Sequence, residues 1–423
     1  MTESNPDIEI SRRRLLGTVG AAGAAGLALG ATGGALAHSA LAGSEGSGGA
    51  AVPSAALGAT AVAFHGDHQA GITTPLQAKG HVLAFDLAPG AGRKEAVALM
   101  RRWSDSARRL MAGQEAGAAD SGIALDAGPC SLTVTFGFGH SFFDRTGLTA
   151  RRPVALDPLP EFSADRLDPQ RGNGDLWIQI GADDALVAFH ALRTLQKDAG
   201  EAARVRWQMN GFNRTPGATA KAMTARNLLG QIDGTGNPKP SDADFERRIF
   251  VPGTGPGPAE HAWMAGGSYA VVRRIRMLLD DWDKQSLAKQ EQVIGRKKAD
   301  GAPLTGGTET TKPDLDKIGP DGKPVIASNA HARISAPAQN GGAAMLRRPF
   351  SYHDGIGADG TPDAGLLFIC WQADPLRGFV PVQRKLDRGD ALSDFIRHEA
   401  SGLYAVPRGP RPEEYVGQPL LEG

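Results

Sequence analysis

The segment LWIQIGADDALVAFHALRTLQKDAG, residues 176–200, decides how the fold of this chain is interpreted. Its first seven residues are mostly large and apolar, which predicts a strand. The remainder predicts a helix, with Asp183 or Asp184 as the N-terminal cap and Gly200 as the stop signal. Because VRWQMNGF at residues 205–212 predicts a second strand, we expect a strand–helix–strand unit here.

The same mixture of elements extends in both directions along the chain. Further strands are expected at residues 81–88, 131–139, 268–277 and 365–372. Helices are expected at residues 93–113, 280–297 and 392–401, and FVPVQRKL at residues 379–386 is expected to be a strand or extended. The pattern favours an α+β fold with two sandwiches, each a sheet covered by helices on one face, over a single doubly wound sheet.

Composition limits the classes of function. The 423 residues are enough for two domains. The 46 basic and 46 acidic residues give no net charge, which argues against a nucleic-acid-binding protein. Two cysteines, Cys130 and Cys370, are too few for a thiolate zinc site or an iron–sulfur cluster, and they leave open one disulfide or two buried thiols.

The N-terminus carries a targeting signal. Residues 11–37, SRRRLLGTVGAAGAAGLALGATGGALA, have a basic start, a weakly apolar run and small-residue exits. The arginines that follow Ser11 indicate the twin-arginine route, which exports folded proteins. The alternative is a membrane anchor, but the glycine and alanine content makes the run poorly hydrophobic. We therefore expect a signal peptide at residues 1–42 and a flexible leader at residues 43–61.

One acid in the chain is framed by glycines. In LLGQIDGTGNPKP, residues 228–240, Asp233 stands between Gly230 and Gly234. Glycine allows the backbone to bend freely and to approach a ligand closely. The stretch therefore predicts a carboxylate held at a binding site.

Histidine and arginine side chains follow about a hundred residues later. SNAHARISAPAQNGGAAMLRRPFSYHDG, residues 328–355, contains His331, Arg333 and Arg347. A lone histidine in a polar loop usually has no chemical role, but an imidazole, cations and an isolated acid are the groups that a haem site needs. A second candidate, a metal pair of His65 and His68, would require a helical turn, against which the neighbouring glycine argues.

Together these motifs resemble the dye-decolourising (DyP-type) haem peroxidases. LLGQIDGTGNP carries the GxxDG motif of that family, and its other motifs occur in the same order over residues 62–415, as FHGDHQAGITTP, WQMNGFNRT, HAR, MLRRPFSY and GLLFICWQADPLRGFVPVQRKL. The exported branch, which includes the deferrochelatase/peroxidase proteins, also has twin-arginine signals. The resemblance implies the DyP-type dimeric α+β barrel: two ferredoxin-like domains with antiparallel sheets, expected at residues 62–250 and 251–423, the second holding haem b.

The resemblance also implies roles for residues of the site. His331 matches the proximal ligand of the haem iron, and Asp394 matches the acid that accepts a hydrogen bond from its other ring nitrogen. An acid in the first turn of a helix also explains Asp394. Asp233 matches the distal acid, which relays a proton between the two peroxide oxygens. Arg347 matches the distal arginine, which stabilises charge on the leaving oxygen.

Other residues are expected around the cofactor. The resemblance implies that Arg333 holds a haem propionate and that Gly234 lets the backbone approach the haem. Leu366 and Phe368 share one face of a strand and are expected to form an apolar wall, with ordinary core packing as the alternative. A long polar insertion at residues 298–325 is expected to screen the haem edge or to bind a partner.

The expected function is a haem b peroxidase that uses hydrogen peroxide to oxidise organic one-electron donors such as dyes and phenols, via Compound I. Two alternatives are a deferrochelatase, which releases iron from haem, and a haem-binding or delivery protein without turnover. Asp233 and Arg347 favour turnover, because a carrier needs neither. The expected partners are hydrogen peroxide, an organic or metal electron donor and the twin-arginine export machinery. The sequence leaves a homo-oligomer open.

Overall fold

The computed structural model describes residues 54–117, 120–219, 223–253 and 259–423, which all belong to one compact unit. The expected signal peptide, residues 1–42, lies outside the described residues. None of the described helices is both long enough and apolar enough to cross a membrane.

Part of the expected flexible leader is ordered. The helix α1 (Ser54–Ala59) falls within it. Within this helix Gly58 O accepts from Cys130 N at 3.1 Å, and directly after it Thr60 O accepts from Ser131 N at 2.7 Å. The described end of the expected leader is therefore joined by hydrogen bonds to the loop that precedes residues 133–139.

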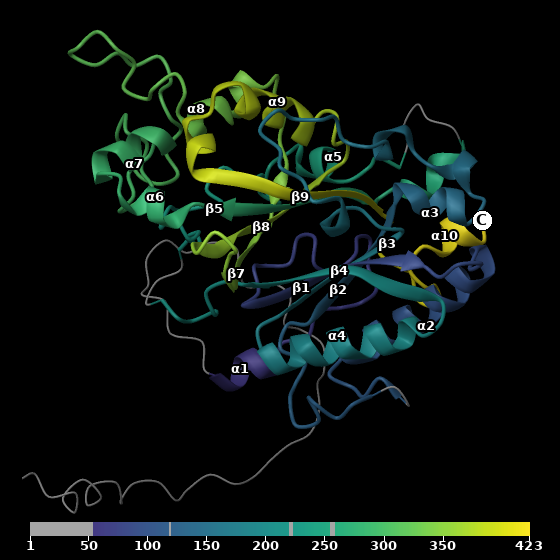
Figure 1. Ribbon diagram of the computed structural model, residues 1–423. Helices are drawn as coiled ribbons and strands as arrows, with labels where there is room; N and C mark the ends of the chain where they lie inside the picture. The colour runs from purple at the N-terminus through teal and green to yellow at the C-terminus, as the bar shows by residue number, and fades with distance from the viewer. Residues whose placement is uncertain (1–53, 118–119, 220–222, 254–258) are drawn as a thin grey trace, which may run out of the picture. The chain divides into compact units, whose positions relative to one another are not determined.

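Four antiparallel strands form a first sheet in the order β2–β3–β1–β4 (Figure 1). The strands are β1 (Lys79–Leu87), β2 (Thr133–Gly139), β3 (Leu176–Ala182) and β4 (Ala203–Phe212). The helix α2 (Arg93–Met111) connects β1 to β2, and α4 (Ala185–Ala199) connects β3 to β4. This is the strand–helix–strand, strand–helix–strand order of a ferredoxin-like unit.

The boundaries of α4 follow from the residues that were expected to set them. Of the two candidate caps, Asp184 is the one used, since its side chain accepts hydrogen bonds from Leu186 N and Val187 N. The helix ends before Gly200, whose φ of 51° is costly for other residues. The predicted strand–helix–strand unit is therefore confirmed.

Four further strands form a second sheet in the order β9–β5–β8–β7. They are β5 (Ser268–Met277), β7 (Phe350–Ile356), β8 (Pro362–Gln372) and β9 (Ile396–Val406), and the short β6 (Leu346–Arg347) also pairs with β8. The helices α6 (Leu279–Asp283) and α7 (Leu287–Ile294) follow β5, and α9 (Phe379–Gly389) connects β8 to β9. The second sheet therefore repeats the ferredoxin-like order.

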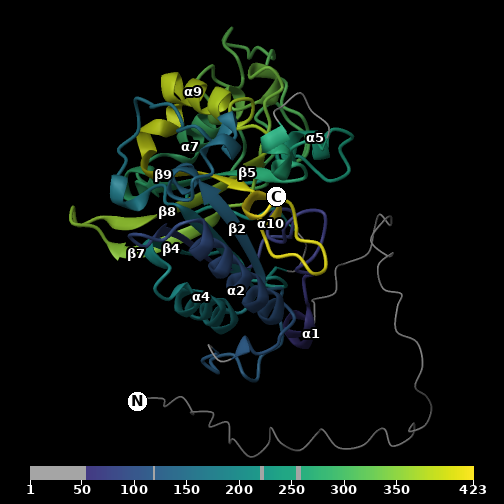
Figure 2. The same ribbon diagram turned by 90° about the vertical axis from the view of Figure 1, so that its right-hand side faces the viewer.

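The two sheets face each other between two layers of helices. Figures 1 and 2 both place α2 and α4 outside the first sheet and α9 outside the second. Through two narrow seams, where Phe138 pairs with Ala405 and Phe212 pairs with Ser351, the two four-stranded halves form one continuous sheet, which the pairing of β5 with β8 closes into a ring. Trp177, from the first sheet, packs 5.9 Å from the ring of Trp371, from the second. The expected α+β fold with two ferredoxin-like units is confirmed.

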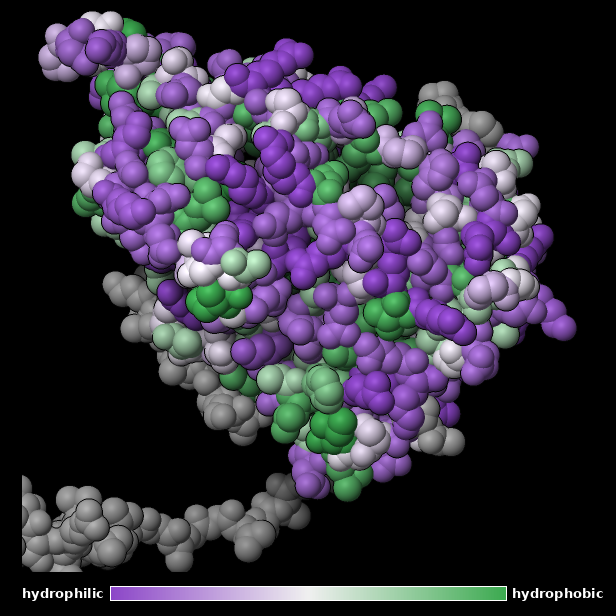
Figure 3. All heavy atoms as spheres, viewed as in Figure 1, coloured by the Kyte–Doolittle hydropathy of each residue, from purple (hydrophilic) through white to green (hydrophobic). Residues whose placement is uncertain are grey.

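Short helices and turns complete the unit, and the exposed surface is mainly polar. The remaining elements are α3 (His140–Arg145), α5 (Phe245–Ile249), α8 (His331–Ile334), α10 (Gln418–Leu421) and the 3₁₀ turns Thr149–Arg151, Val154–Leu156, Pro169–Arg171, Ala259–Met264, Pro337–Gln339 and Ala391–Phe395. Hydrophilic residues dominate the face shown in Figure 3, as expected for a chain with 22% charged residues. Cys130 and Cys370 are free buried thiols rather than a disulfide.

Three of the expected elements were wrong. FVPVQRKL forms the helix α9, in which Phe379, Val380 and Gln383 are buried at helical spacing. The expected helix at residues 392–401 is instead a 3₁₀ turn followed by β9, because pairing with β5 over ten residues outweighs the local helical pattern. The expected helix at residues 280–297 is divided into α6 and α7, since the side chain of Ser286 starts a new helix by accepting from Lys289 N.

Candidate active site

Asp233 lies in a loop whose turns depend on glycine. Gly230 and Gly234 have φ values of 76° and 130°, which residues with a Cβ rarely adopt. A Cβ at Gly230 would also lie 2.7 Å from Lys298 Cε. The backbone N–H of Asp233 donates to Ala225 O at 2.9 Å, which closes the loop on itself.

The Asp233 carboxylate is held at both oxygens. Arg347 Nη1 lies 2.9 Å from Asp233 Oδ1, and Asn227 Nδ2 donates to Asp233 Oδ2 at 3.3 Å. The Arg347 and Asp233 side chains are 28% and 19% exposed, so part of each side chain remains accessible to solvent. Arg347 is in β6 and is paired with Cys370 of β8, which fixes its backbone to the second sheet.

Asn237 fixes Arg347 from the same glycine-rich loop. Asn237 Oδ1 accepts from Arg347 N at 3.1 Å and from Arg347 Nε at 3.2 Å, while Asn237 Nδ2 donates to Arg347 O at 2.7 Å. These bonds use the backbone and the side chain of Arg347 together. Asn237 was not expected at the site, although its position four residues after Asp233 could have suggested it.

His331 begins α8, and its ring is oriented by a buried carboxylate. His331 Nδ1 lies 2.6 Å from Asp390 Oδ2, and the Asp390 side chain is only 2% exposed. Burial acts to lower the pKa of His331, but the net shift is upward because the Asp390 carboxylate raises it. Arg347 and Asp233 also act on this pKa, in opposite directions. The structure therefore brings His331, Asp233 and Arg347 within electrostatic reach of one another.

Asp394 does not contact His331, so Asp390 replaces it as the partner of the ring. Asp394 is exposed within the 3₁₀ turn Ala391–Phe395. Asp390 is the cap of that turn and accepts from Leu392 N at 3.0 Å, which leaves its other oxygen for His331. Asp394 was expected because it matches an acid that the resemblance implies, but the acid that contacts the ring lies four residues earlier.

Arg333 anchors the polar insertion. Its Nε and Nη2 donate to Ile326 O at 3.1 and 2.8 Å, and Nη2 also donates to Leu315 O. These bonds fix α8, and with it His331, to residues 298–325. The expected contact of Arg333 with a cofactor carboxylate would have to use Nη1.

Arg348, the neighbour of Arg347, points into the protein rather than into the site. It is buried and donates to Thr74 O and Pro75 O, at 2.6 and 2.8 Å, and to Gln77. Burial lowers the pKa of Arg348 to about 10. Its contacts join the first ferredoxin-like unit to the strand pair that carries Arg347.

Leu366 and Phe368 lie on one face of β8, as expected. Leu366 is buried and Phe368 is half-buried, and both pack in a cluster with Ile275 of β5 and Leu392. Leu367, between them, belongs to a different cluster on the opposite face. The packing shows an apolar surface of the second sheet below α9.

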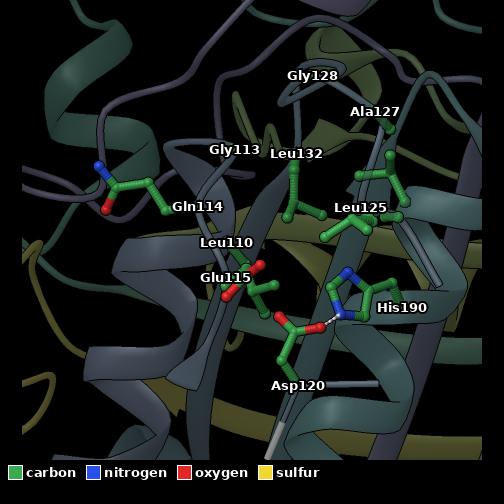
Figure 4. Close-up of a pocket in the computed structure, with 12 residues that line it drawn as sticks. Leu110, Gly113, Gln114, Glu115, Asp120, Leu125, Ala127, Gly128, Leu132 and His190 are labelled. Carbon is green, nitrogen blue, oxygen red and sulfur yellow. Dashed lines mark hydrogen bonds and ion pairs between the residues drawn. The ribbon is translucent and has the colours of Figure 1, made fainter. Parts of the chain in front are cut away.

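The pocket shown in Figure 4 lies elsewhere, between α2, α4 and the loop that follows α2. It has a volume of about 260 Å³ and contains the buried pair His190 Nε2–Asp120 Oδ1 at 2.8 Å. Asp120 also accepts from Ala116 N and Gly122 N, so it holds its own loop in place. None of the residues expected at the site lines this cavity.

No metal site forms at His65 and His68. His65 Nδ1 contacts Pro410 O, and the two ring nitrogens of His68 contact Gly266 O and Glu246. Within residues 54–117, 120–219, 223–253 and 259–423, no group of three or more His, Cys, Asp or Glu side chains is placed to hold a metal ion.

Comparison with known proteins identifies the family. The model described as Dyp-type peroxidase, N-terminal, matches residues 69–213, and that described as Dyp-type peroxidase, C-terminal, matches residues 224–411. A dye-decolorizing peroxidase of Thermobifida fusca (strain YX) is 44% identical over 439 residues, covering 100% of both chains. A deferrochelatase of Escherichia coli (strain K12) is 36% identical over 376 residues, covering 85% of this chain and 86% of that one.

Solved structures agree with this result. A DyP-type peroxidase from Streptomyces coelicolor is 73% identical, covers 88% of this chain and 100% of its own, and superposes with a TM-score of 0.85. Ferric DtpA from Streptomyces lividans is 72% identical with the same coverage and a TM-score of 0.86. Because the family models match most of the chain and the Thermobifida relative spans all of it, the chain belongs to the Dyp-type peroxidase family.

Proposed function

We propose that the protein is a haem b peroxidase that uses hydrogen peroxide to oxidise organic one-electron donors such as dyes and phenols. The observation that carries this proposal is the Arg347–Asp233 pair, at 2.9 Å, within electrostatic reach of His331. Cleavage of the peroxide O–O bond needs an acid–base group and a fixed positive charge, whereas a haem carrier needs neither. The relative in Thermobifida fusca, named as a dye-decolorizing peroxidase, supports the same activity.

The residues around His331 fit haem b. A neutral imidazole that donates its Nδ1–H to Asp390 carries its lone pair on Nε2, the nitrogen that would bind iron. The His331 side chain is 30% exposed, so Nε2 can be reached. Leu366 and Phe368 would supply an apolar wall, and Arg333 Nη1 would hold a propionate. Bound haem would supply the iron that takes oxidising equivalents from peroxide.

Asp233 and Arg347 have different roles in the cleavage of peroxide. The Asp233 carboxylate accepts the proton of the inner peroxide oxygen and returns it to the outer oxygen, which leaves as water. Arg347 remains charged at all accessible pH values and stabilises the negative charge that develops on the leaving oxygen. Gly234, whose φ is 130°, would let the backbone of the Asp233 loop lie close to bound haem.

The proposal is tested on the purified protein reconstituted with haem b. One equivalent of hydrogen peroxide should change the haem absorption within seconds, and a phenol or dye should then reverse the change while being oxidised. An Asp233→Asn/Arg347→Leu double variant is the control, since it should bind haem and react with peroxide far more slowly. An unchanged spectrum and no donor oxidation in the wild type would show a carrier rather than a peroxidase.

Release of iron from haem is a second candidate, because relatives that are 36% identical over most of this chain are named deferrochelatases. Two relatives named as peroxidases, from Thermobifida fusca and Streptomyces coelicolor, are more similar, at 44% and 73% identity. Haem supplied under reducing conditions would yield free protoporphyrin IX, detected by its fluorescence, if this candidate were correct.

We also propose export by the twin-arginine machinery to the periplasm, the cell surface or the medium, with residues 1–42 as the signal peptide. Arg12, Arg13 and Arg14 before a weakly apolar run support this. Replacing all three with lysine should leave the protein in the cytoplasmic fraction.

We propose domains at residues 62–250 and 251–423, since β1 to β4 precede this boundary and β5 to β9 follow it.

A further inference from the structure

The polar insertion at residues 298–325 contributes one carboxylate to the Asp233 loop. Glu309 Oε1 accepts hydrogen bonds from Thr224 Oγ1 at 2.5 Å and from Thr235 Oγ1 at 2.9 Å. The two threonines lie on either side of Asp233 in the sequence. A single oxygen atom therefore joins the start of the loop to the residues just beyond the acid.

Glu309 is itself held close to the loop. Arg296 Nη1 donates to Glu309 O and to Gly301 O, both at 2.8 Å. A Cβ at Gly301, whose φ is 73°, would lie 2.9 Å from Ile232 Cδ1, so the insertion touches the residue before Asp233. These contacts fix the insertion directly against the loop.

Glu309 also lies within the electrostatic reach of the site. Burial lowers the pKa of Arg296, the Glu309 carboxylate opposes that shift, and Arg347 adds to it. Arg296 is therefore near both Glu309 and Arg347. Two positive and two negative side chains are gathered here, with Glu309 and Asp233 as the acids.

The two halves of the loop have different supports. Arg226 Nη1 donates to Gly230 O at 2.8 Å and to Lys298 O at 2.6 Å, and Trp282 Nε1 donates to Leu229 O at 3.0 Å, so the first half is fixed before Asp233 is reached. After Asp233 the hydroxyl of Thr235 is bound by Glu309. Glu309 therefore supports the loop beyond the acid, in addition to the direct contacts that Arg347 and Asn227 make with the Asp233 carboxylate.

We propose that Glu309 is a positioning residue for Asp233: its carboxylate closes the loop across Thr224 and Thr235 and so sets where the acid meets peroxide. This rests on the proposed peroxidase function. Glu309 touches no reacting atom and acts through Asp233. A displacement of about 1 Å of a catalytic group can cost roughly 10²-fold in rate, so a modest loosening of the loop is sufficient for a large effect.

Matched variants of the haem-loaded protein test the proposal. Glu309→Ala removes both hydrogen bonds and should lower the second-order rate constant for reaction with peroxide roughly 10- to 100-fold. Glu309→Gln keeps an acceptor oxygen and should restore most of the rate. Glu291→Ala is the control, because Glu291 also binds the insertion, at Lys298 N, but contacts neither threonine, and the rate should stay at the wild-type value.

A double-mutant cycle separates positioning from general damage. In an Asp233→Asn background, Glu309→Ala should change the rate less than twofold, because the residue through which it acts has already lost its function. A full additional loss in that background would overturn the proposal. If Glu309→Ala does not bind haem, Thr235→Val, which removes one of the two bonds, takes its place in the cycle.

Hydrogen exchange gives a readout that does not depend on activity. The amide of Asp233, bound to Ala225 O, should exchange faster in Glu309→Ala than in the wild type and in Glu291→Ala. Unchanged exchange together with an unchanged rate would refute the positioning role. A wild-type protein that does not react with peroxide would refute the peroxidase function instead, while faster exchange in Glu309→Ala would still support the structural part of this proposal.

Discussion

Asp390→Asn is expected to weaken the binding of haem about 10- to 100-fold. The carboxylate lies 2.6 Å from His331 Nδ1 and is 2% exposed, so it forms a buried hydrogen bond with a charged acceptor. Such bonds are worth about 1.5–3 kcal/mol. Loss of an outer partner of a metal-binding histidine usually costs about 10–100-fold in affinity, or about 1.4–2.7 kcal/mol, and the two ranges agree.

The chemistry of the amide explains the direction of this effect. The new amide N–H can donate to His331 Nδ1, which moves the ring proton to Nε2 and removes the lone pair needed for iron. The amide oxygen can still accept from Leu392 N, as Asp390 Oδ1 does at 3.0 Å. The variant should therefore keep its fold, while His331 Nε2 becomes a poorer ligand for iron.

The haem-free variants are titrated with haem, and the increase in Soret absorption gives the affinity for haem. The melting temperature of each variant shows whether the fold is retained. Asp394→Asn is the matched control, because it makes the same chemical change at an exposed acid four residues away and should leave the affinity unchanged. Wild-type affinity in Asp390→Asn, or weakened binding in Asp394→Asn, would refute the reasoning.

Three other predictions concern the distal residues and a buried histidine. Asp233→Asn should slow the reaction with peroxide by roughly 10²–10⁴ and Arg347→Leu by roughly 10²–10³, measured by stopped-flow absorbance with haem still bound; a wild-type rate in Asp233→Asn would mean that another group moves the proton. Asn237→Ala removes three hydrogen bonds to Arg347 and should cost roughly tenfold in the same assay, and no loss would show that β6 alone orients the arginine. Burial lowers the pKa of His398 to about 3, below the value of about 6.5 in the unfolded chain, so its contribution to stability is present above pH 6.5 and is lost as pH falls. Between pH 7.5 and 5 the wild type should lose about 2 kcal/mol more unfolding free energy than His398→Gln in urea titrations, and parallel curves would show that His398 ionises within the fold.

The first ferredoxin-like unit could be predicted from the sequence because its signals are local. The cap at Asp184 and the stop at Gly200 are set by neighbouring residues, and they define α4 without knowledge of the rest. In contrast, β9 was expected to be a helix because its pairing partner β5 lies more than a hundred residues away. A pattern read along the chain does not contain the hydrogen bonds that such a partner supplies.

The same distinction applies to the site. Asp233 was found through its glycines, which record a local requirement of the backbone. Asp390, Asn237 and Glu309 act through residues distant in sequence, and only Asn237, four residues after Asp233, has a neighbour that could have suggested its role. The family resemblance pointed to an acid near His331, but it was assigned to Asp394 rather than to Asp390, four residues earlier in the chain.

The position of β9 has a consequence for how the protein is made. It is the last strand in the chain, yet it lies between β5 and β2 and forms one of the two seams that join the sheets. Ribosomes add about 5–20 residues per second, and an N-terminal unit can fold as it emerges. β1 to β4 can therefore assemble early, whereas the second sheet waits for its final strand. A chain that stops at residue 395 would contain Asp233, His331, Arg347 and Asp390 and still lack the strand that joins β5 to β2, so the sheet beside these residues is complete only when the whole polypeptide has been made.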